Sequence, residues 1–266
     1  MCIRDRGNSF QIALPERVDV VICDHVGYFG FDYGLIETMA DARRRFLKPG
    51  GSMLPFQLRL QLSAVESDKC RELAEGWTAP GIPVEFSWLR QHGVNSKHAV
   101  NLQADEVLAG PAQLACIDLR ADNPEFFSWT VELTMARDGV MHGLAGWFEC
   151  ELAENVWMTN SPLSPRAIKR SQAFLPIDGP LAVKAGDSVS ATIMARPADH
   201  LIAWEGWHPA SGRKFSHSTW QGDLLMQGQL RASRPEHVPQ THRAARAQGL
   251  VFGYCDAQRT GGAIRA

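Results

Sequence analysis

The fold is decided by residues 18–51, which read VDVVICDHVGYFGFDYGLIETMADARRRFLKPGG. Val18–Cys23 is an almost continuous apolar run, which is typical of a strand buried on both faces of a parallel sheet. Asp24 follows this strand directly, at the edge where doubly wound sheets bind their ligands. A glycine-bearing loop leads to a helix that we expect to begin near Asp32, whose side chain can cap it. Pro49–Gly51 is a helix stop signal, so we expect the helix to end there.

The helix and the segment after it have clear apolar periodicities. Helical spacing of apolar residues predicts one buried face, formed by Leu35, Ile36, Met39, Phe46 and Leu47. The next strand is expected to begin near Ser52. Residues 53–66 alternate between apolar and polar side chains, which predicts a strand with one buried face.

The rest of the chain is predicted to be mainly β-structure. Residues 68–77 fit either a short helix or an irregular segment, and residues 79–83 are a turn cluster. Strand-like runs separated by turn residues span 113–119, 128–135, 141–152, 187–195, 201–207 and 218–226. Five of the eight tryptophans lie between residues 129 and 207, which suits the core of a barrel or sandwich.

Composition sets the broad class of the protein. The 266 residues are 45% hydrophobic and 21% charged, as expected of a globular protein with one large or two smaller domains. A net charge of −2 favours neither nucleic acid nor an anionic membrane as a partner. No apolar run approaches the roughly 18 residues of a membrane span. The six scattered cysteines form no CxxC pair, which predicts reduced thiols, no metal site and a cytoplasmic location.

Three motifs carry a family resemblance. Leu14–Asp19, Gly27-Tyr28 and Leu47–Gly51 resemble, in order and spacing, the corresponding segments of the protein arginine methyltransferases. Residues 143–148, 161–165 and 181–187 resemble three landmarks of that family's β-barrel. The resemblance covers roughly residues 9–226. It implies an enzyme that uses S-adenosylmethionine, with a methyltransferase α/β domain followed by a barrel.

The resemblance also places the site residues. Two glutamates of the family hold the acceptor guanidinium; Asp24 stands at the first position and Tyr33 at the second, with Asp32 one residue earlier. Asp32 has an alternative role as the helix cap. Tyr28 falls in the active-site loop, or is a packing aromatic, and His25 replaces a family tryptophan. His25 is either a base or simply an exposed histidine.

A second substrate feature of the family is changed. The family's Thr-His-Trp loop falls on Ala167-Ile168-Lys169, where none of the three residues matches. Asp24 is also one methylene shorter than glutamate. The acceptor, a protein or a small molecule, is therefore not fixed by the resemblance.

The fold class expected is α/β plus all-β: the last part of a doubly wound Rossmann-like sheet, then a barrel or sandwich. Residues 1–6 are expected to be a non-native leader. Residues 7–58 are expected to be the α/β remnant, 59–230 a barrel for substrate binding and dimerisation, and 231–266 a tail or a truncated helical module. No Gly-x-Gly occurs, so most of the cofactor site is expected to lie upstream.

Two functions follow. The first is an S-adenosylmethionine-dependent methyltransferase of the arginine methyltransferase type, impaired in cofactor binding. The resemblance implies a homodimer formed through an arm at residues 86–107. The alternative is a non-catalytic barrel that binds a partner on a degenerate methyltransferase frame. The retained strand, loop and helix favour the first, and the altered acidic pair favours the second.

Overall fold

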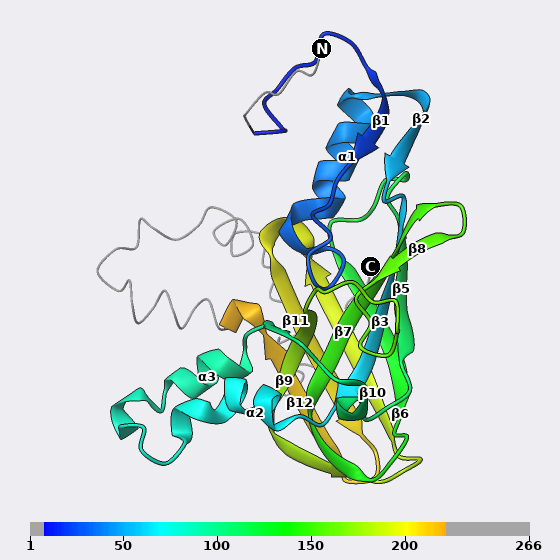
Figure 1. The fold of residues 1–266 in the computed structure, drawn as a ribbon. Coiled ribbons are helices and arrows are strands. Elements are labelled where there is room, and N and C mark those ends of the chain that lie inside the picture. Colours follow the sequence, from blue (N-terminus) through cyan, green and yellow to red (C-terminus); the bar gives the residue numbers. More distant parts are fainter. Residues whose placement is uncertain (1–7, 222–266) are drawn as a thin grey trace, which may run out of the picture.

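The computed structural model describes residues 8–221. The expected leader 1–6 and the expected tail or helical module 231–266 lie outside these residues. In the described part, a strand–helix–strand unit lies at one end of a β-barrel, and a helical arm projects from the barrel's side (Figure 1). No helix in this part is long and apolar enough to cross a membrane.

The strand–helix–strand unit consists of β1 (Val18–Ile22), α1 (Leu35–Arg45) and β2 (Leu47–Leu54). The two strands pair in parallel as a two-stranded sheet. The expectation that β1 is buried on both faces is wrong for this part of the chain, because Val20 is 47% and Ile22 is 73% exposed. The physical reason is that β1 pairs only with β2 among the described strands.

Both ends of the expected helix need correction. A 3-10 turn at Asp32–Gly34 precedes α1, and Gly34 occupies the N-cap position without a side-chain cap. The helix ends at Arg45, four residues before Pro49, and Pro49–Gly51 lies inside β2 instead of terminating the helix. Pro49 is tolerated there because it falls in the register shift between the pairs Val18–Leu47 and Val20–Ser52. The buried face at Leu35, Ile36 and Met39 is confirmed.

The β-rich part forms two antiparallel sheets that close into a barrel (Figure 1). One sheet has the order β12-β11-β10-β6, and the other has the order β4-β9-β7-β3-β5, with β8 paired to β7. Their bounds are β3 Gln57–Val65, β4 His98–Val100, β5 Ala112–Asp118, β6 Phe127–Thr134, β7 Gly139–Ala153, β8 Val156–Thr159, β9 Gln172–Val183, β10 Ser188–Arg196, β11 Leu201–His208 and β12 Arg213–Ser218.

Most of the expected barrel strands are confirmed. Strands β4, β8 and β9 were not expected from the sequence. Among the described residues the last strand is β12, which ends at Ser218, whereas the sequence pattern predicted a strand that begins at residue 218. The alternation in β3 is confirmed, since Leu58, Leu60 and Leu62 are fully buried.

One hydrophobic core connects α1 to the barrel. Phe29, Leu35 and Met39 from the strand–helix–strand unit belong to the same buried cluster as Leu60 and Trp204 of the barrel. Trp147 is also fully buried, in a second cluster. The loop between β1 and α1 is thus held against the barrel by shared packing.

The helical arm consists of α2 (Asp68–Glu75), two 3-10 turns at Gly76–Thr78 and Val84–Phe86, and α3 (Leu89–Val94). It projects to one side of the barrel in Figure 1. At its base, Arg90 pairs with Glu75 of the arm at 3.3 Å and with Asp178 of β9. The arm also exposes apolar side chains, namely Leu73, Trp77, Ile82, Val84 and Phe86.

Candidate functional site

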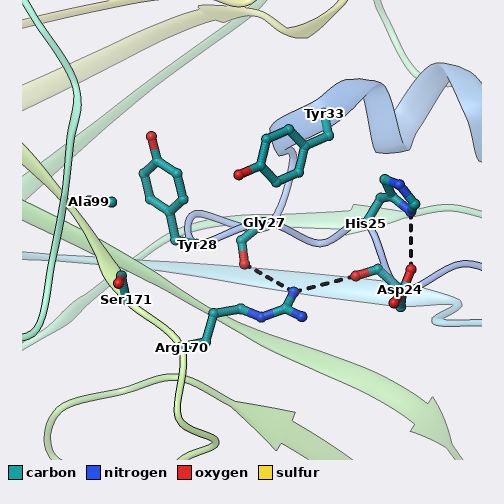
Figure 2. Close-up of a pocket in the computed structure, with 8 residues that line it drawn as sticks. All are labelled: Asp24, His25, Gly27, Tyr28, Tyr33, Ala99, Arg170 and Ser171. Atoms are coloured by element: carbon teal, nitrogen blue, oxygen red, sulfur yellow. Dashed lines mark hydrogen bonds and ion pairs between the residues drawn. The ribbon is translucent and has the colours of Figure 1, made fainter.

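The candidate site is a pocket of about 430 Å³ beside the loop that connects β1 to α1. The loop contributes most of the lining, and the barrel side contributes the rest (Figure 2). Its lining residues are Asp24, His25, Gly27, Tyr28, Tyr33, Ala99, Arg170 and Ser171. Four of the five residues singled out from the sequence, all except Asp32, therefore share one pocket.

Asp24 is the exposed acid of this pocket. It follows the carboxyl end of β1, and its side chain is 89% exposed. The imidazole Nδ1 of His25 lies 3.0 Å from Asp24 Oδ1 (Figure 2). An exposed carboxylate at the end of a strand is available to a ligand, so the geometry is compatible with the predicted role, which stays a prediction.

Asp32 has a different environment from the one expected. Its side chain is buried, and Oδ2 accepts hydrogen bonds from the backbone N–H groups of Tyr28 at 2.9 Å and Phe29 at 2.7 Å. Its other oxygen, Oδ1, pairs with the ammonium of Lys97. The expectation that Asp32 caps the helix is wrong, because its carboxylate turns back toward the preceding loop instead of the first turn of α1.

The two tyrosines lie on the same side of the loop in Figure 2. Tyr33 is 63% exposed and adopts a left-handed backbone conformation with φ 59°, which is uncommon for a bulky residue. Burial raises the pKa of Tyr28 above its ordinary value, and the nearby Asp32 and Tyr33 raise it further. Tyr28 is therefore a neutral phenol at physiological pH, able to donate a hydrogen bond but not to act as a resident base.

Barrel residues fix the loop from the other side. Asn160 is fully buried; its Nδ2 donates to the carbonyls of Tyr28 at 2.9 Å and Ser171 at 2.6 Å, and its Oδ1 accepts from Phe148 N at 2.9 Å. The guanidinium of Arg170 donates to the carbonyls of Asp24 at 3.3 Å and Gly27 at 3.2 Å (Figure 2). The loop backbone is thus anchored by hydrogen bonds as well as by packing.

Sequence reasoning missed three residues of this site: Lys97, Asn160 and Arg170. They stand 65, 132 and 143–146 positions from their loop partners. A pattern within one segment carries no signal for such pairs. The one available signal was proximity to a motif, because Asn160 and Arg170 flank the Ser161–Pro165 landmark and the altered Ala167–Lys169 loop.

The glycines of the loop do not form a cofactor cradle. A Cβ on Gly27 would lie 2.2 Å from Asp32 Cβ, and one on Gly30 would lie 2.8 Å from a Leu60 methyl group. These glycines therefore make room for the protein's own side chains rather than for a phosphate or nucleoside. At Gly27 and Gly30 the space that a Cβ would take is thus already occupied by Asp32 and Leu60.

Comparison with known proteins gives a consistent result. The family described as "Arginine methyltransferase oligomerization subdomain" matches residues 60–203, which is more than half of the chain. The chain is 31% identical over 190 residues to "Arginine N(omega)-methyltransferase" of Streptomyces achromogenes subsp. streptozoticus, covering 71% of this chain and 50% of that protein. It is 26% identical over 200 residues to "Protein arginine N-methyltransferase 1" of Schizosaccharomyces pombe, covering 73% and 58% of the two chains.

Solved structures share the fold. The Trypanosoma brucei PRMT1 enzyme-prozyme heterotetrameric complex with AdoHcy superposes with a TM-score of 0.67 at 18% identity, over 80% of this chain and 71% of that one. Protein arginine methyltransferase 10 of Arabidopsis thaliana gives a TM-score of 0.65 at 17% identity, over 81% and 74%. This chain spans about half the length of the curated relatives it matches. From the matched subdomain and these relatives, the chain belongs to the arginine methyltransferase family.

Proposed function

We propose that this chain supplies the acceptor side of an S-adenosylmethionine-dependent methyl transfer site. The observation that carries the proposal is the exposed carboxylate of Asp24 in a 430 Å³ pocket, on a loop anchored by the barrel. The cofactor supplies an electrophilic methyl group. Asp24 pairs with a positively charged acceptor and orients it, which is the contribution that positioning makes to a displacement reaction.

The pocket presents one carboxylate to the acceptor rather than two. Asp32 is engaged with Lys97 and the loop amides, and the phenol of Tyr33 stands in the pocket at the other expected position. A guanidinium bound by Asp24 alone has one edge paired and the other edge facing phenols. We therefore propose a basic acceptor, in a protein or a small molecule, that needs a single acidic partner.

Cofactor binding by this chain alone is proposed to be weak. The sequence has no Gly-x-Gly turn, and the space beside Gly27 and Gly30 is filled by side chains of the protein. The parallel pair β1–β2 with α1 is proposed to be part of a Rossmann-like sheet that ends with β2, and the barrel domain to begin with β3. The expected end of the barrel at residue 230 lies outside the described residues. The scattered cysteines support the proposal of a cytoplasmic location.

The test is transfer of label from tritiated S-adenosylmethionine. The acceptors are free arginine, an arginine-rich peptide and a cell lysate. The 266-residue chain is assayed beside a chimaera in which the cofactor-binding segment of the Streptomyces relative precedes residue 8. We expect label in an acceptor with the chimaera, and little transfer or cofactor binding with the chain alone.

A second function is favoured by one observation. The inward pairing of Asp32 with Lys97 and the phenol of Tyr33 leave the acidic pair incomplete, as in a barrel that only binds a partner. A chimaera that binds the cofactor in calorimetry but labels no acceptor supports this second function. Label transfer excludes it.

The arm is proposed to mediate self-association. Val84 is 78% and Phe86 is 48% exposed on the arm, and exposed apolar side chains of this kind are typical of a docking surface. Replacing both residues by glutamate is expected to weaken self-association at least about a hundredfold, because charges would enter an apolar interface. Light scattering after size exclusion measures the mass. Val156→Glu on β8, 52% exposed and away from the arm, is the matched control. An unchanged mass of the double variant would contradict the proposal.

A further inference from the structure

Lys97 occupies a place that connects the arm with the site loop. It lies in the short connection between α3 and β4, so it follows the arm directly. Its ammonium pairs with Asp32 Oδ1 and lies 4.7 Å from the centre of the Tyr28 ring and 5.9 Å from that of Phe31. The Lys97 side chain is only 18% exposed, and that of Asp32 is 4% exposed.

The Asp32 carboxylate joins this ammonium to the loop backbone. One carboxylate oxygen pairs with the Lys97 ammonium, and the other accepts hydrogen bonds from the amides of Tyr28 and Phe29. Gly27 leaves the space that this carboxylate fills. A nearly buried carboxylate without a cation would keep most of its desolvation cost, so the arrangement depends on Lys97.

The direction of the Asp32 side chain bears on which acids face the pocket. Asp32 lies one residue before Tyr33, but its carboxylate is bound to Lys97 and to the amides of Tyr28 and Phe29, and it does not line the pocket. The Lys97 ammonium lies over the Tyr28 ring in a cation–π arrangement, which fixes one wall of the pocket. Both effects act through residues that Lys97 touches, not through contact with the acceptor.

We propose that Lys97 is a positioning residue, which holds Asp32 inward and thereby sets the conformation of residues 27–33, so that Asp24 is the sole acid of the pocket. The importance of Lys97 for methyl transfer rests on the proposed function, whereas its effect on the loop conformation does not.

Amide hydrogen exchange of the full chain tests the proposal. In Lys97→Met, the amides of Tyr28 and Phe29 are expected to exchange at least about tenfold faster, because their charged acceptor loses its cation and moves. Lys97→Arg keeps the charge and is expected to remain within about threefold of the wild-type rates. Lys48→Met, which removes an exposed pair with Asp19, is the control and is expected to leave these two amides unchanged.

The outcomes separate the inference from the proposed function. Wild-type exchange at Tyr28 and Phe29 in Lys97→Met overturns the inference, as does equally fast exchange in Lys97→Arg. If Lys97→Met does not fold, Asp32→Asn removes the same charge pair with little change in shape, and the same acceleration is expected. Absence of label transfer by the wild-type chimaera would overturn the proposed function while leaving the exchange result intact.

Discussion

Methyl transfer by the chimaera is expected to fall at least about a hundredfold when Asp24 is replaced by alanine. The reason is that Asp24 is the exposed carboxylate of the pocket, whereas Asp32 is buried in its pair with Lys97. No neighbouring acid of the pocket lining can replace it. The measurement is kcat/KM for label transfer at fixed cofactor concentration, compared with wild type.

Two further variants sharpen this result. Asp19→Ala is the matched control, because Asp19 lies on β1, just before Asp24 in the chain, and is 79% exposed, but it pairs with Lys48 and does not line the pocket. It is expected to keep wild-type activity. Asp24→Glu extends the carboxylate by one methylene, roughly an ångström, and is expected to retain or raise the rate with a guanidinium acceptor. Equal rates for wild type and Asp24→Ala would remove Asp24 from the site.

The sequence predicted the elements of the fold better than their surroundings. The alternation in Gln57–Val65 and the periodicity of Leu35, Ile36 and Met39 each report burial within one segment, and both are confirmed. The burial of β1 was predicted wrongly, because a continuous apolar run does not reveal which strands pair with it. The apolar pattern of a segment predicts which of its side chains tend to be buried. It does not show which other segments cover them, because that depends on the tertiary structure.

The candidate site was also only partly predictable from the sequence. Proximity to the end of β1 predicted the pocket position of Asp24, because strand ends are recognisable in the sequence. The orientation of Asp32 was not predictable, since both a helix cap and an inward anchor require an acid before α1. The inward orientation pairs Asp32 with Lys97, which lies 65 positions later in the chain, after the arm. The left-handed conformation of Tyr33 also has no local signal, because glycine or asparagine is the usual residue in that region.

Replacing Asn160 by alanine is expected to lower the free energy of unfolding by about 3–5 kcal/mol. The Asn160 side chain is fully buried, and its loss leaves Phe148 N, Tyr28 O and Ser171 O without this partner. Each such buried group costs about 1–3 kcal/mol when no other partner is available, and relaxation reduces the sum. Chemical denaturation measures the change. For a domain of this size it corresponds to a fall in Tm of roughly 10 °C.

Asn160→Asp separates the acceptor role of the Asn160 side chain from its donor role. Aspartate keeps an oxygen for Phe148 N but removes the donor to Tyr28 O and Ser171 O, and it adds a buried charge facing two carbonyls. Asn123→Ala, which removes hydrogen bonds to two carbonyls of a surface turn, is the control and is expected to cost under about 1 kcal/mol. A similarly small loss for Asn160→Ala would mean that water or a shifted side chain satisfies the three groups. A loss of several kcal/mol, with faster exchange in residues 26–31, would show that the barrel holds the site loop through this one amide.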